Sequence, residues 1–129
     1  MPRALFGNNL RFMQRTVLIV DDHAVFRSAA RALLEADGFR VVGDAADGGA
    51  GLAAARELHP DVVLLDVRLP DVDGFTVAAE MTGAEGAPAV VVTSSSDDPR
   101  YPDLALRSGA VGFVAKHDLC GSEFHGMLS

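Results

Sequence analysis

Five short segments of mostly apolar residues recur along the chain, separated by stretches of mixed character. They are rich in valine, leucine and isoleucine and show little alternation with polar residues. Such a pattern is typical of strands that are buried on both faces of a parallel sheet. The sequence therefore predicts five parallel strands. These are Val17–Val20, Phe39–Ala45, Val62–Leu65, Ala89–Val92 and Gly112–Ala115.

Apolar residues at helical spacing follow the first predicted strand. Phe26, Ala29, Ala30 and Leu33 fall at positions i, i+3, i+4 and i+7, which places one apolar stripe along a helix. Gly38 can end this helix, because glycine adopts the left-handed conformation that often follows a helix. The stripe predicts that these four residues face the sheet.

A second helix is predicted between the second and third strands. Asp47-Gly48-Gly49 is typical of a turn, and Leu52, Ala55 and Leu58 then form the expected buried stripe of the helix. Pro60 closes this helix, because proline cannot continue it.

Three further helices are predicted less strongly by the pattern. One runs from about Phe75 to Thr82, and a weak one lies within Pro99–Ser108, where Pro102 is tolerable only in a first turn. The segment Asp118–Ser129 is expected to be a short final helix, weakened by its two glycines.

Alternating strands and helices with short connections predict an α/β fold, a doubly wound five-stranded parallel sheet with helices on both faces. The expected strand order is 2-1-3-4-5. Residues 1–15 lack a sustained period and are expected to be a poorly ordered extension, with Met13 a candidate start. Residues 16–129 form the one predicted domain.

Polar residues collect where the predicted strands end. Asp21 and Asp22 follow the first strand, Asp66 follows the third, Thr93 the fourth and Lys116 the fifth. Ligands of open α/β sheets bind beyond the carboxyl ends of the strands, so these residues share one candidate site. Clustered carboxylates resist full ionisation without a cation, and Mg²⁺ is the expected cofactor.

The same residues suggest phosphoryl chemistry. Asp66, last on the central strand, is the candidate nucleophile, because a carboxylate beside a metal and a cation can accept a phosphoryl group. Lys116, the single lysine of the chain, would neutralise the new charge. Thr93 could donate a hydrogen bond to a phosphoryl oxygen.

Each candidate also has a structural explanation. Asp22 could only cap the first helix, and Asp66 could be a turn residue at a strand end. Thr93 is a good strand former, and Phe113 is a core residue unless it is a mobile aromatic. His23 is expected to be a solvated neighbour of the acid pair. Four strand ends with suitable residues in the right order nevertheless favour a functional site.

Charge and composition narrow the function further. Eighteen acidic and eleven basic residues give a net charge of −7, which disfavours direct binding of nucleic acid. No apolar stretch approaches the roughly 18 residues of a membrane span, and the N-terminus lacks a signal-peptide core, so a cytoplasmic protein without membrane contact is expected. Cys120 stands alone and is assigned no role.

From about Thr16 to Leu128 the chain resembles the response-regulator receiver domains of two-component signalling. The motifs that carry the resemblance surround the four strand ends already described. They are Val17-Leu18-Ile19-Val20-Asp21-Asp22-His23, the segment Asp61–Pro70 with Asp73-Gly74, Val90-Val91-Val92-Thr93-Ser94, and Gly109–Lys116.

The resemblance implies a role for each matching residue. Asp66 would be the phosphoacceptor, and Asp21, Asp22, Asp66 and the main-chain carbonyl of Arg68 would site Mg²⁺. Thr93 and Lys116 would contact the phosphoryl group, while Thr93 and the rotating aromatic Phe113 would form the switch. The implied donor is a phosphohistidine of a sensor histidine kinase or phosphotransfer protein. The chain would be no enzyme beyond its own phosphorylation and dephosphorylation.

Several alternatives remain at this point. The sequence around Asp66 is most similar to that of receivers joined to a helix-turn-helix DNA-binding domain. The chain is therefore either a stand-alone receiver or a part of such a regulator. A receiver fold could also serve only as a phosphorylation-independent docking module. The downstream partner protein is not identified by the sequence, and a homodimer is left open. A haloacid-dehalogenase-type phosphatase is disfavoured, because it needs a second acid where Arg68 stands. A flavodoxin-like cofactor binder is disfavoured because no phosphate-cradling glycine loop is present.

Overall fold

A computed structural model describes residues 14–119 and 121–128 of the chain. Its centre is a five-stranded sheet in the order β2-β1-β3-β4-β5, with every neighbouring pair parallel. The predicted fold class and strand order are therefore confirmed. The strands are β1 Thr16–Val20, β2 Arg40–Ala45, β3 Val62–Asp66, β4 Ala89–Ser94 and β5 Gly112–Ala115.

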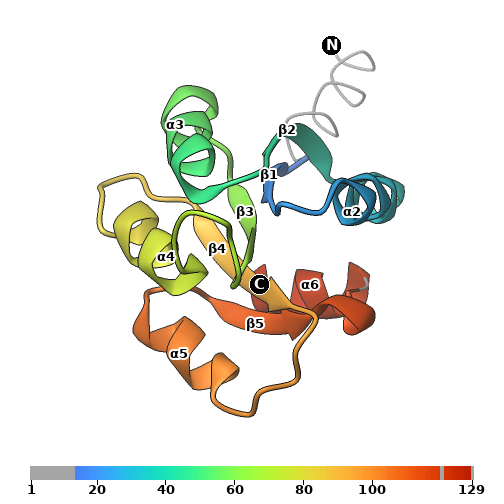
Figure 1. Ribbon diagram of the computed structural model, residues 1–129. Coiled ribbons are helices and arrows are strands. Elements are labelled where there is room, and N and C mark those ends of the chain that lie inside the picture. Colours follow the sequence, from blue (N-terminus) through green and yellow to red (C-terminus); the bar gives the residue numbers. More distant parts are fainter. Residues whose placement is uncertain (1–13, 120, 129) are drawn as a thin grey trace.

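Helices cover both faces of the sheet (Figure 1). The α-helices are α2 Ala24–Ala36, α3 Gly48–Leu58, α4 Gly74–Thr82, α5 Tyr101–Arg107 and α6 Gly121–Leu128, and a short 3₁₀ helix, η1, spans Lys116–Asp118. All five predicted helical segments are present, and Pro102 lies in the first turn of α5 as its chemistry requires.

Two separate hydrophobic cores flank the sheet because consecutive strand residues point to opposite faces. On one face, Leu65 and Val92 pack against α3, α4 and α5. On the other, Leu64 and Val91 pack against α2 and α6, where Phe124 is completely buried. Residues of the inner strands β1, β3 and β4 therefore meet apolar neighbours whichever way they point, which explains their runs without alternation, whereas the edge strand β2 exposes Arg40 and Asp44.

The apolar stripe of α2 differs from the predicted one. Ala30 and Leu34 are buried and Phe26 is half-buried, whereas Ala29 and Leu33 are exposed. The prediction of Ala29 and Leu33 as buried was wrong because the helix carries apolar residues in adjacent pairs. Such pairs fit two stripes one residue apart, and the packing on the sheet decides between them.

The start and the stripe of α3 also differ from prediction. Gly48 and Gly49 belong to the helix and not to a turn, because the Asp47 side chain caps it by accepting a hydrogen bond from the Ala50 N–H. Leu52 is half-buried as expected, but Leu58 at the C-terminal end is 39% exposed, so its predicted burial was wrong.

The predicted N-terminal extension falls almost entirely on residues 1–13, which include Met13 and lie outside the described residues. Cys120 also lies outside them. The order of the extension and the domain boundary at residue 16 stay predictions. Among the residues that the structure describes, no helix has both the length and the apolar character needed to cross a membrane.

Candidate functional site

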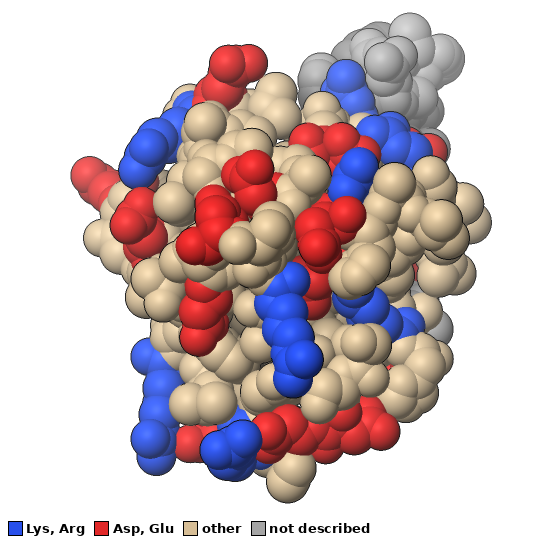
Figure 2. Space-filling model, in the orientation of Figure 1, with Lys and Arg blue, Asp and Glu red and all other residues tan. Residues whose placement is uncertain are grey.

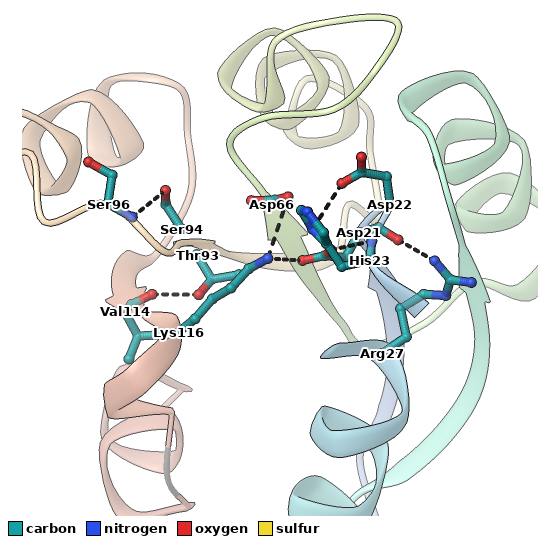
Figure 3. Close-up of polar contacts among 10 residues, drawn as sticks. All are labelled: Asp21, Asp22, His23, Arg27, Asp66, Thr93, Ser94, Ser96, Val114 and Lys116. Carbon is teal, nitrogen blue, oxygen red and sulfur yellow. Dashed lines mark hydrogen bonds and ion pairs between the residues drawn. The ribbon is translucent and has the colours of Figure 1, made fainter. Parts of the chain in front are cut away.

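The strand register brings the predicted site residues to one edge of the sheet. Val20 pairs with Leu65, so the next residues, Asp21 and Asp66, lie beside each other on neighbouring strands. Asp66 pairs in turn with Thr93. Lys116 follows directly on β5 (Figure 3). Figure 2 shows acidic side chains gathered on this face, over the region where β1 and β3 lie in Figure 1.

Lys116 joins the two buried carboxylates. Its Nζ atom lies 2.6 Å from Oδ2 of Asp21 and 3.6 Å from Oδ2 of Asp66. The lysine side chain is 13% exposed and the aspartate side chains are nearly inaccessible, so water screens these charges little. The ammonium group also lies 4.3 Å from the centre of the Phe26 ring, which favours a cation.

His23 contacts both carboxylates of the acid pair. Its main-chain N–H donates to Oδ1 of Asp21 at 2.8 Å, and its Nδ1 atom lies 3.0 Å from the same oxygen. The Nδ1 atom also lies 3.1 Å from Oδ1 of Asp22. Sequence reasoning treated His23 as a solvated neighbour and missed these contacts, because nothing in the pattern indicates where an exposed histidine ring turns.

Asp22 does not cap α2, which removes the structural explanation considered for it. The N-cap residue is His23, and no side chain caps this helix end. Instead, the carboxylate of Asp22 lies at the rim of the site, 36% exposed, beside the two buried ones. The main-chain carbonyl of Asp21 is held in place by the Arg27 side chain, from which it accepts a hydrogen bond at 2.6 Å.

The Asp66 carboxyl is shifted toward its neutral form. Burial and the charge of Asp21 raise its pKa from 3.8 to about 6, with Asp22 adding to the rise. The charge of Lys116 and a hydrogen bond from the Arg68 N–H act in the opposite direction. The unfavourable effect of burial on the ionised Asp66 carboxylate therefore outweighs the favourable effect of the nearby Lys116 charge.

The two predicted switch residues lie on β4 and β5. The buried hydroxyl of Thr93 donates to the Val114 carbonyl at 2.7 Å, so it is directed toward β5 rather than toward Asp66. Phe113 is half-buried, with its ring centre 5.6 Å from that of Tyr101, which contacts Phe75 at the same separation. A role of Thr93 and Phe113 in switching stays a prediction.

The donor set fits a divalent cation. One ligand atom from each of Asp21, Asp22, His23 and Asp66 can be chosen so that all lie within 4.8 Å of one another. Oδ2 of Asp21 is buried and lies 2.6 Å from the Lys116 ammonium group, so this oxygen already faces a cation. Carboxylate oxygens suit Mg²⁺, while an imidazole suits transition metals better.

The raised pKa of Asp66 predicts how stability depends on pH. A folded-state pKa above the unfolded value means that protonated Asp66 stabilises the fold, a contribution that is full below about pH 4 and lost as pH rises through about 6. A shift of about two pH units corresponds to about 3 kcal/mol. Without divalent metal, Asp66→Asn should therefore gain free energy of unfolding relative to wild type as pH rises from about 4 to 7.

Urea unfolding of both proteins at several pH values measures this difference. The matched control is Asp37→Asn, which removes one acid at an exposed position just beyond the end of α2, away from the site, and the pH profile of Asp66→Asn is compared with it. An Asp66→Asn protein whose stability follows the wild-type pH profile would contradict the assignment of the buried carboxyl.

Comparisons with known proteins agree with this geometry. Residues 17–119 match the family model of the response regulator receiver domain. The chain is 42% identical over 107 residues to the virulence factors putative positive transcription regulator BvgA of Bordetella pertussis, covering 82% of this chain and 51% of BvgA. It is 44% identical over 108 residues to a protein-glutamate methylesterase/protein-glutamine glutaminase of Anaeromyxobacter dehalogenans, covering 81% of this chain and 30% of that protein.

The similarity extends to solved structures. The signal receiver domain of the putative response regulator NarL from Mycobacterium tuberculosis superposes with a TM-score of 0.79 and 35% sequence identity, covering 90% of this chain and 98% of that domain. The chain spans about half the length of BvgA, of a putative transcriptional regulator of Pseudomonas aeruginosa and of the response regulator GacA of Pseudomonas syringae. It belongs to the receiver domain family of two-component response regulators.

Proposed function

We propose that Asp66 accepts a phosphoryl group from a phosphohistidine of a sensor histidine kinase or phosphotransfer protein. The observation that carries this proposal is the placement of two buried carboxylates, Asp66 and Asp21, around the ammonium group of Lys116 at adjacent strand ends. Membership of the receiver family supports the kind of donor. The chain would act on no other substrate and would catalyse only its own phosphorylation and dephosphorylation.

The chemistry places distinct demands on Asp66 and Lys116. A carboxylate oxygen of Asp66 would attack phosphorus as the P–N bond of phosphohistidine breaks, and the histidine nitrogen would keep the electron pair and take up a proton. With a pKa of about 6, Asp66 is mostly ionised at neutral pH and available as the nucleophile. The ammonium group of Lys116 would move from Asp21 toward the negatively charged oxygens of the new phosphoryl group.

Mg²⁺ would be held by the carboxylates of Asp21, Asp22 and Asp66 and by the main-chain carbonyl of Arg68. The clustering of ligand atoms from Asp21, Asp22 and Asp66, which lie within 4.8 Å of one another, supports this assignment. When bound, the ion would neutralise phosphoryl oxygens and hold them near the accepting carboxylate. Asp21 and Asp22 would thus orient the ion, and Asp66 would be spared part of the repulsion that raises its pKa.

Intact mass measurement tests the acceptor. Incubation with acetyl phosphate and Mg²⁺ should raise the mass by one phosphoryl unit, and chelation of the metal should prevent the gain. Asp66→Asn should show no gain, whereas the control Asp61→Asn, which precedes the opposite end of β3, should behave as wild type. Phosphorylation of Asp66→Asn at an undiminished rate would rule out Asp66 as the acceptor.

We further propose that the phosphoryl group acts on Thr93 and Phe113 together. It would carry close to two negative charges and strong acceptor oxygens in place of the single charge of the Asp66 carboxylate, and Asp66 pairs with Thr93 across β3 and β4. The Thr93 hydroxyl would then leave the Val114 carbonyl and free space for the Phe113 ring. The segment from Ser94 to Asp98 is held by short-range hydrogen bonds and can rearrange at low cost.

NMR with and without a beryllofluoride mimic of the phosphoryl group tests this switch. The resonances of the Phe113 ring and of the amides from Ser94 to Asp98 should shift in wild type and in Thr93→Ser, which keeps the hydroxyl. Thr93→Val has nearly the same shape but no hydroxyl, and should lose the distant shifts. Wild-type shifts confined to the immediate neighbours of Asp66, with Phe113 unmoved, would defeat the switch.

The output of the domain is also a proposal. The aligned region covers only about half the length of the relatives named as transcription regulators, so a receiver that works as part of a DNA-binding regulator remains an alternative to a stand-alone receiver. In either case we expect residues 16–129 to act on a partner protein or a second copy of the chain, because a net charge of −7 disfavours phosphate contacts. Specific retention of duplex DNA at physiological salt by this chain would contradict that expectation.

A further inference from the structure

The loop between β3 and α4 is tied to the N-terminal end of α3. The carboxylate of Asp71 accepts two hydrogen bonds from the first turn of α3, at 2.8 Å from the Gly48 N–H and 2.9 Å from the Gly49 N–H. These bonds hold the pKa of Asp71 below its usual value, with the Gly48 bond the largest cause. The helix N-terminus favours the negative charge.

The contact leaves no space between loop and helix. A Cβ atom on Gly48 would collide with the side chain of Val72, and it would lie 3.3 Å from Oδ1 of Asp71. The glycines of α3 therefore allow the loop to approach the helix axis. The loop is closed at its base as well, because the Gly74 N–H donates to the Val67 carbonyl at 2.7 Å and Arg68 pairs with Asp73.

The same helix turn rests on the end of β1. A Cβ atom on Gly51 would lie 2.9 Å and 3.0 Å from the two methyl groups of Val20, the residue before Asp21. In addition, the Asp21 N–H donates to the Ala45 carbonyl at the end of β2. The first turn of α3 thus contacts the strand that carries the acid pair and binds the loop that carries Arg68.

We infer that Asp71 is a positioning residue for the metal site: its two bonds to α3 fix the distance between the acid pair and the Arg68 main chain. This inference rests on the proposed function, in which the Arg68 carbonyl and the acid pair bind one ion. Without the tie, the loop keeps the packing of Leu69 and Val72 on the core and its closure at the base, and the Arg68 main chain becomes less restrained relative to the acid pair. Residues that orient metal ligands typically affect affinity about 10- to 100-fold.

A matched pair of variants separates positioning from simple capping. Asp71→Ala and Asp47→Ala each remove one negative charge and a cap of the same helix end, but among the described residues the Asp47 side chain accepts only from the Ala50 N–H and does not hold the loop. We expect Asp71→Ala to weaken Mg²⁺ binding at least about 10-fold by calorimetry. Asp47→Ala should bind within about twofold of wild type, although both melt at lower temperature.

Two results would overturn the inference. One is wild-type Mg²⁺ affinity in Asp71→Ala, and the other is an equal loss of affinity in both variants, which would mean that a weaker helix end suffices. If Asp71→Ala does not fold, Asp71→Asn takes its place, because the amide keeps one acceptor and should show an intermediate loss. Failure of the proposed function looks different: wild type itself would then take up neither Mg²⁺ nor a phosphoryl group.

Discussion

The mutual repulsion of carboxylates at adjacent strand ends is the constraint on which the candidate site depends. Asp21 and Asp66 are both buried, and one ammonium group serves the two. Such a set is stable only with its charge partly offset by protons, by Lys116 or by a bound cation. The hydrophobic sheet supplies the rigidity that holds like charges together, and the cation or the phosphoryl group then changes a balance that the fold has already set.

The positions and order of the strands could be predicted from the sequence because the inner strands β1, β3 and β4 are buried on both faces and leave continuous apolar runs, whereas the edge strand β2 exposes Arg40 and Asp44. The shared edge of Asp21, Asp66 and Lys116 followed from the parallel order alone. Side-chain directions could not be predicted in the same way. The Thr93 hydroxyl has acceptors both on β5 and across the site, and its bond to the Val114 carbonyl depends on local separations that no pattern encodes.

Other features escaped prediction because they join distant segments. The bonds of Asp71 to Gly48 and Gly49 connect residues more than 20 positions apart, and neither segment alone indicates the other. Phe26 and Ala30 were placed correctly in the stripe of α2, but Leu33 was predicted as buried where the sheet surface selects the chemically similar Leu34. Periodicity therefore located the helix, while packing selected which side of it became the interior.

The division of the core by the sheet has a consequence for recognition. Phe113 packs with the core under α3, α4 and α5, whereas α2 and α6 lie over the other core, which shares no residue with the first. A rearrangement confined to the first core would leave the α2 and α6 surface with the same shape in both states. A protein that docks there would bind both states equally, and equal affinity shifts no conformational equilibrium. One partner could thus bind the α2 and α6 surface without activating the domain. The surface of α3, α4 and α5 would then be the one that differs between the two states.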